Sequence, residues 1–182
     1  GSFLDNKRVV LVAAPHQSGK DEYLMILIIL ALDVDVCYLS AKWTMRRIPN
    51  PFEKSKDIDD QGIKWPLGWL QEIIFRKFGA IPVDRKGNSG QYDSVIEELK
   101  KRDSFLLIVT PEGRFDATRF RTSFLFIAKE LNAEVMPVQI DYENEIFNIL
   151  ESFNIEGDTE SVVKNLRLKF DGIKGKKSRF KA

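Results

Sequence analysis

Apolar runs and segments of helical periodicity take turns along most of the chain. Continuous apolar runs, typical of strands buried on both faces, predict strands at 8–14, 34–39, 80–83, 105–110 and 135–140. An apolar segment up to Leu32 predicts a helix, and amphipathic or apolar segments predict further helices over 67–78, 89–102, 121–131 and 160–170. This alternation predicts one α/β domain over residues 3–171, with a mixed, largely parallel central sheet and helices on both faces.

Two segments fall outside this alternation. Residues 45–64 contain Pro49, Pro51 and Gly62 without an apolar period, and we expect a loop long enough to act as a lid. Residues 172–182 carry five basic side chains and no acidic one. We expect a basic C-terminal tail there, which either binds an anionic surface or is a solvated chain end.

Composition narrows the classes of function. Lys and Arg number 28 against 27 Asp and Glu, so overall charge gives no argument for nucleic acid, and we expect no such partner. Cys37 is the only cysteine, which excludes an intramolecular disulfide, and its apolar surroundings predict a buried strand position. The longest apolar run, at 23–32, is about half of the roughly 20 residues that a membrane-spanning helix needs, so we expect no segment to cross a bilayer.

The only histidine of the chain, His16, follows the first predicted strand at the start of a turn. A neutral imidazole there can accept the proton of an attacking hydroxyl group, which makes His16 a candidate general base. Asp21 lies five residues later and can orient the ring if the turn folds back. The alternative is a surface histidine beside an aspartate that begins a helix. No Gly-x-Ser-x-Gly segment is present, so we expect no acyl-enzyme intermediate.

Residues 14–21 also resemble a phosphate-binding P-loop, because they lie between a predicted strand and a predicted helix. That loop requires glycine at its first position and serine or threonine at its last, where the hydroxyl binds magnesium. This chain has Ala14 and Asp21 at those positions. A nucleotide-binding protein is therefore the less favoured alternative.

Four short segments occur in a fixed order: His-Gln-Ser-Gly-Lys-Asp at 16–21, Ile-Pro-Val-Asp-Arg at 81–85, Thr-Pro-Glu-Gly-Arg at 110–114 and Val-Met-Pro-Val at 135–138. Together they resemble the four-block signature of the 1-acylglycerol-3-phosphate acyltransferase family, whose first block is His-x4-Asp. The resemblance implies a glycerolipid acyltransferase fold and an O-acyltransferase without a cofactor. Such an enzyme moves a fatty acyl group from an acyl thioester, either acyl coenzyme A or acyl carrier protein, to the hydroxyl group of a lysophospholipid or glycerol-phosphate-type acceptor.

The resemblance also implies residue roles. It assigns His16 and Asp21 to catalysis, Arg85 and Arg114 to the acceptor's phosphate group, and Glu112 and Gly113 to the acceptor site as a nearby carboxylate and a tight turn. Arg114 follows Gly113 directly, where the family has a threonine between them. The alternatives are solvated surface arginines and a Glu112 that pairs with Arg114.

A phosphate-bearing lipid acceptor must be reached from a membrane, so the resemblance implies a cytoplasmic protein that associates peripherally with an anionic membrane surface. Residues 64–70 and 76–78 combine tryptophans, other apolar residues and cations, a composition that suits such docking. The alternative for this segment is a helix packed on the sheet. A catalytically inactive, lipid-binding relative is the alternative for the whole chain.

Overall fold

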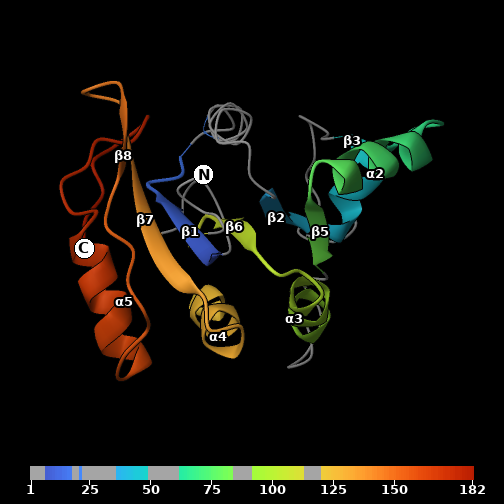
Figure 1. Ribbon diagram of the computed structural model, residues 1–182. Coiled ribbons are helices and arrows are strands. Elements are labelled where there is room, and N and C mark those ends of the chain that lie inside the picture. The colour runs from blue at the N-terminus through green and yellow to red at the C-terminus, as the bar shows by residue number, and fades with distance from the viewer. Residues whose placement is uncertain (1–6, 18–20, 22–35, 49–61, 84–91, 113–119) are drawn as a thin grey trace. The chain divides into compact units, whose positions relative to one another are not determined.

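A computed structural model describes residues 7–17, 21, 36–48, 62–83, 92–112 and 120–182 (Figure 1). The chain divides into two compact units. Unit 1 comprises Gly1–Asp35 and Asp103–Ala182, and unit 2 comprises Val36–Arg102. Unit 1 is thus built from two stretches of sequence that are far apart.

The sheet of unit 1 is mixed and mostly parallel. Its strands are β1 (Arg8–Ala14), β6 (Phe105–Val109), β7 (Glu134–Asp141) and β8 (Ile146–Ile149), in the order β6-β1-β7-β8. β1 pairs in parallel with β6 on one side and with β7 on the other, while β8 runs antiparallel to β7. All five residues of β6 are buried, as are six of the seven in β1. The continuous apolar runs therefore form central strands, as the sequence predicts.

Two described helices belong to unit 1. Helix α4 (Ser123–Glu130) buries Phe124, Leu125, Ile127 and Ala128. Helix α5 (Thr159–Leu168) begins where the Asp158 side chain accepts a hydrogen bond of 2.8 Å from the Ser161 amide, a cap that stabilises a helix by about 1 kcal/mol. Val162 and Leu166 are its buried residues. Both helices thus turn a narrow apolar stripe toward the core of the unit.

Residues 172–180 of unit 1 fold back on themselves, and we call them the C-terminal hairpin. Lys174 and Arg179 form an antiparallel bridge, and the Phe180 amide donates to the Ile173 carbonyl over 2.8 Å. The Tyr142 amide donates to the Lys174 carbonyl over 2.8 Å, which ties the hairpin to the end of β7. Most of the residues that the sequence predicts as a basic C-terminal tail therefore belong to this hairpin.

The C-terminal hairpin ends in an aromatic cluster. The ring of Phe180 lies 5.4 Å from that of Phe120 and 6.1 Å from that of Phe170, measured between centroids, and the guanidinium of Arg167 lies 5.6 Å from two of these rings. All three phenylalanines are buried. Aromatic pairs in such tilted arrangements add to the hydrophobic gain of burial, so this cluster anchors the end of unit 1.

Unit 2 contains a parallel strand pair and a small antiparallel one. β2 (Val36–Ala41) pairs in parallel with β5 (Ala80–Val83), and β3 (Arg47–Ile48) pairs with β4 (Ile63–Lys64). A 3-10 helix η1 (Lys42–Met45) follows β2, helix α2 (Gly68–Lys77) precedes β5, and helix α3 (Asp93–Lys100) follows it. Cys37 is fully buried in β2, as the sequence predicts.

These elements confirm the predicted α/β class with a mixed, largely parallel sheet. The loop expected over 45–64 is partly wrong, because its described ends pair as β3 and β4, which are too short to give a periodic signal. Residues 49–61, the predicted helix up to Leu32, and residues 84–91 lie outside the described residues. No helix in the described part of the chain is long and apolar enough to cross a membrane.

Gly79 joins α2 to β5 in a conformation that only glycine adopts easily. Its φ is +83°, and a Cβ atom there would lie 2.0 Å from the Val36 carbonyl oxygen. Gly157 has a φ of +82°, but a Cβ atom on this residue would have no atom other than those of its chain neighbours within 4 Å. The two glycines therefore share the backbone strain and differ in the steric contact.

We expect Gly157→Ala to lower the free energy of unfolding by about 1–2 kcal/mol, the usual cost of a left-handed residue. Gly79→Ala should cost at least about 2 kcal/mol more, because the Val36 carbonyl belongs to the backbone and cannot turn away. Chemical denaturation of both variants gives the difference. Equal losses would contradict the close approach of β2 to Gly79.

Candidate functional site

The candidate site lies in unit 1, where three parallel strands end. His16 comes two residues after β1, Glu112 three residues after β6, and Tyr142 directly after β7. Parallel strands bring their carboxyl ends to one edge of a sheet, and polar groups that follow them gather there. The pairing of β1 between β6 and β7 thus places these three residues together.

The side chains of His16 and Asp21 are adjacent, as the His-x4-Asp spacing allows. Nδ1 of His16 lies 3.2 Å from Oδ2 of Asp21, and the two residues are 6% and 0% exposed. The same Oδ2 accepts a hydrogen bond of 2.9 Å from the Gln17 amide, which ties Asp21 to the residue after His16. A carboxylate at this distance favours the tautomer with the proton on Nδ1, which leaves Nε2 as the atom that can act as a base.

Tyr142 completes the surroundings of Asp21. Its hydroxyl group donates a hydrogen bond to Oδ1, the carboxylate oxygen that does not face the imidazole. A buried carboxylate is stable only when hydrogen bonds replace its lost hydration. Asp21 is therefore fixed from both sides, and its orientation toward His16 depends on Tyr142 as well as on the local turn.

Glu112 is a second buried carboxyl group next to His16. Its Oε2 accepts a hydrogen bond of 2.9 Å from the His16 amide, and the residue is 4% exposed. Burial raises the pKa of Glu112 from 4.5 to about 7, and the His16 amide offsets only part of that effect. Near neutral pH this carboxyl group is therefore present in both its protonated and its ionised form, beside the candidate base.

The C-terminal hairpin holds the side chain of Gln17, the residue that follows His16. Oε1 of Gln17 accepts hydrogen bonds from the amides of Lys177 and Ser178, at 2.8 and 2.9 Å, and Nε2 donates to the Ser178 hydroxyl group at 3.0 Å. A Cβ atom on Gly175 would lie 2.6 Å from Oε1 of Gln17, so the hairpin approaches this side chain closely. One residue of the first block thus connects the candidate site to the hairpin.

Three of the six residues assigned by the resemblance are described by the structure. It brings His16, Asp21 and Glu112 together, whereas Arg85, Gly113 and Arg114 lie outside the described residues. Arg121 is described, and its amide donates to the Pro111 carbonyl over 2.8 Å. The chain therefore passes back beside Glu112 after the part that is not described.

Tyr142 and Gln17 are the residues that sequence reasoning missed. Tyr142 follows a parallel strand, and this position was a usable signal for a side chain at the same edge as His16. Gln17 gave no such signal, since its partners lie 160 and 161 residues further along the chain.

This arrangement can remove a proton from a bound hydroxyl group. His16 offers a base whose tautomer Asp21 fixes, and Asp21 can stabilise the imidazolium that forms. Among the described residues, no group of three or more His, Cys, Asp and Glu side chains is placed to hold a metal ion.

A comparison with models of known protein families finds no match to the chain, and a search among curated proteins finds no similar sequence.

The raised pKa of Glu112 predicts how stability depends on pH. Between about pH 4.5 and 7 the folded protein keeps this proton while the unfolded chain releases it, so stability falls as the pH rises through this range, by up to about 3 kcal/mol. In Glu112→Gln this contribution is absent, and the decline should be correspondingly smaller. Urea denaturation of both proteins at several pH values measures it, and an identical pH profile would contradict the burial of Glu112.

The role of Tyr142 can be observed directly, because His16 is the only histidine. In ¹⁵N spectra we expect the Nδ1-protonated tautomer in the wild-type protein. Tyr142→Phe leaves Oδ1 of Asp21 without its donor, so Asp21 holds the ring less firmly and the Nε2-protonated form should gain population. Tyr92→Phe, which removes a hydroxyl group at the start of α3, is the control. An unchanged tautomer ratio in Tyr142→Phe would show that Asp21 is positioned without Tyr142.

Proposed function

We propose that this protein is an O-acyltransferase that moves a fatty acyl group from an acyl thioester to the hydroxyl group of a lysophospholipid or glycerol-phosphate-type acceptor. The observation that supports it best is the buried carboxylate of Asp21, 3.2 Å from Nδ1 of the only histidine. The two residues stand at the edge of a parallel sheet where substrates of α/β proteins commonly bind. The order of the four sequence blocks supplies the reaction class.

In the proposed reaction, Nε2 of His16 accepts the proton of the acceptor's hydroxyl group while the oxygen attacks the thioester carbonyl carbon. The tetrahedral intermediate collapses, the carbon–sulfur bond breaks, and the leaving thiolate takes the proton from the imidazolium. Asp21 stabilises the imidazolium between these two steps. No acyl-enzyme forms, and the products are the ester and a free thiol.

The acceptor's phosphate group is assigned to Arg85 and Arg114, because a guanidinium can bind two phosphate oxygens at once. Glu112 and Gly113 belong to the same acceptor site in this proposal. Glu112 is buried beside the His16 amide, so a change in its protonation would alter the charge next to the candidate base.

The proposed location is the cytoplasmic surface of an anionic membrane, since the acceptor is a lipid. The exposed apolar residues of α2 support this part of the proposal. Trp69, Ile73 and Phe78 are 58%, 53% and 61% exposed, and Arg76 and Lys77 lie among them. The sequence left open whether this stripe packs on the sheet, and its exposure favours contact with another surface.

The reaction class is tested by a screen of acyl coenzyme A and acyl carrier protein donors of several chain lengths against lysophospholipids and glycerol 3-phosphate. The readout is free thiol released only when both substrates are present. Magnesium ATP added in a thermal melting experiment tests the nucleotide-binding alternative. Lipid binding without thiol release from any pair would identify an inactive, lipid-binding relative.

His16→Gln should lower turnover by about 10²–10⁴-fold, the usual contribution of a general base, while the protein still folds. Glutamine keeps a polar side chain of similar length but does not accept a proton at neutral pH. Lys129→Gln, on the exposed side of α4, serves as the control for handling and stability. Turnover within a few-fold of the wild-type value, at equal melting temperature, would remove His16 from the mechanism.

A further inference from the structure

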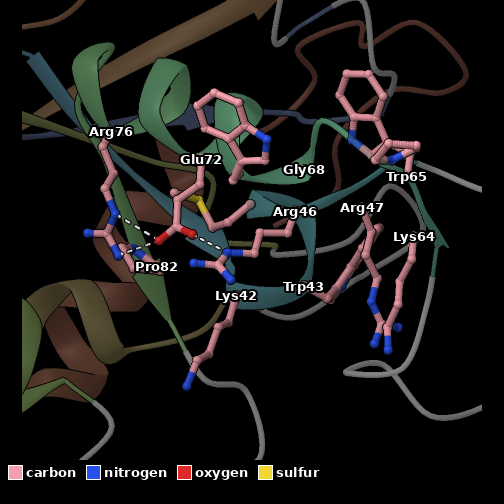
Figure 2. A pocket seen from close by; sticks show the side chains of 13 residues that line it. Lys42, Trp43, Arg46, Arg47, Lys64, Trp65, Gly68, Glu72, Arg76 and Pro82 are labelled. Carbon is pink, nitrogen blue, oxygen red and sulfur yellow. Dashed lines mark hydrogen bonds and ion pairs between the residues drawn. The ribbon is translucent and has the colours of Figure 1, made fainter.

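Unit 2 contains a cavity that the proposed reaction does not use. Its volume is about 610 Å³, and Figure 2 shows the side chains around it, which come from η1, β3, β4, α2 and β5. The lining includes five basic side chains and one acidic one, together with all three tryptophans of the chain. The basic residues are Lys42, Arg46, Arg47, Lys64 and Arg76.

We propose that this cavity binds the phosphate headgroup of an anionic phospholipid at a membrane surface. The proposal does not depend on the acyltransferase reaction, because it concerns binding by unit 2 alone. In this proposal the basic side chains bind the phosphate group, and the tryptophans contact the adjoining interfacial region of the lipid.

Hydrogen bonds within unit 2 hold the cavity in shape. Nε2 of Gln71 donates to the carbonyls of Thr44 and Arg47, at 2.7 and 3.0 Å, and Oε1 accepts from Nε1 of Trp65 at 2.7 Å. A Cβ atom on Gly68 would lie 2.6 Å from the Arg46 carbonyl oxygen, so α2 begins in direct contact with the chain that follows η1. The walls are thus fixed before a ligand binds, which reduces the entropic cost of binding.

Glu72 neutralises only part of the positive charge. Its carboxylate is bound by Arg46, and Arg76 donates two hydrogen bonds to it, at 3.0 Å from Nε and 2.9 Å from Nη2. The hydrogen bond with Arg46 lowers the pKa of Glu72 most, and those with Arg76 lower it further. Glu72 therefore remains ionised and keeps both guanidinium groups in place. Within the described part of the chain, two arginines against one carboxylate leave an excess of positive charge at the cavity.

Further cations line the cavity. Arg47 and Lys64 are direct partners across the β3–β4 ladder, and their side chains extend side by side in Figure 2, with Lys42 pointing in the same direction in this view. Like charges directly opposite each other repel, and a bound anion reduces that repulsion. Among the described residues, Lys42 and Lys64 form no ion pair. A phosphate group carries the charge and the acceptor oxygens that such a cluster binds.

The apolar surroundings favour a lipid over a soluble phosphate ester. Trp69 lines the cavity and is exposed, and Leu70 and Ile73 of α2 and Phe78, directly after the helix, are exposed as well. Tryptophan and basic side chains together are characteristic of the level of lipid headgroups. A small soluble ligand would use the cations and leave this stripe in water, whereas a membrane surface covers both.

Because all three tryptophans line this cavity, intrinsic tryptophan fluorescence reports on it selectively. The experiment titrates the full chain with phosphatidylcholine vesicles that contain increasing fractions of phosphatidic acid, and separately with glycerol 3-phosphate. The charge variant is Lys42→Gln with Lys64→Gln. The control is Lys100→Gln with Lys101→Gln, which removes two exposed charges from the end of α3 and leaves the cavity lining unchanged.

We expect saturable blue-shifted emission with vesicles that contain phosphatidic acid, and roughly thirtyfold weaker binding of the Lys42 and Lys64 variant, since each cation at an anionic surface strengthens binding several-fold. The control variant should bind as the wild-type protein does. Equal binding to pure phosphatidylcholine vesicles, or an unchanged affinity of the Lys42 and Lys64 variant, would overturn the proposal. Saturation by glycerol 3-phosphate at the same concentration as by the lipid would overturn the lipid assignment in favour of a soluble ester. None of these outcomes requires turnover, so they are independent of the acyltransferase proposal.

Discussion

The parallel pairing of β1 between β6 and β7 is the constraint on which the candidate site depends. The register fixes Val12 opposite Val109 on one side and Ala14 opposite Gln139 on the other, so the chain leaves all three strands at nearly the same level. A slip of one residue would exchange the side chains that β1 presents to the two faces of the sheet and would shift His16 relative to the ends of β6 and β7. Burial of this strand therefore sets the position of His16 before any polar contact contributes.

Two carboxyl groups near His16 are buried, but their surroundings differ. Asp21 accepts hydrogen bonds from the Gln17 amide and the Tyr142 hydroxyl group, and it faces the imidazole. Glu112 accepts a hydrogen bond from the His16 amide, but its burial has the larger effect and raises its pKa to about 7. One acid is thus placed to orient the ring, and the other is placed to change charge near neutral pH.

Much of unit 1 was predictable, because its strands are local apolar runs with clear ends. The spacing of His16 and Asp21 also sufficed, since the two residues are close in sequence and the Gln17 amide donates to Asp21. The contacts of Tyr142 and Gln17 were not predictable, because their partners are 121 and about 160 residues away and no local pattern encodes them. For α2, periodicity located the helix but could not say whether its apolar side is covered, and in the structure Ile73 and Phe78 are exposed.

Unit 1 also has a consequence for how the protein folds during synthesis. His16 and Glu112 are 96 residues apart, and Gln17 and Lys177 are 160 apart, so β1 emerges from the ribosome long before its partners exist. Unit 2 is one continuous stretch that is synthesised in that interval, while the apolar residues of β1 remain without β6 and β7. Long-range parallel pairing of this kind is slow and exposes the nascent chain to aggregation. β1 therefore stays without its neighbours until residue 141 has been added, and its apolar side chains are open to aggregation during that time.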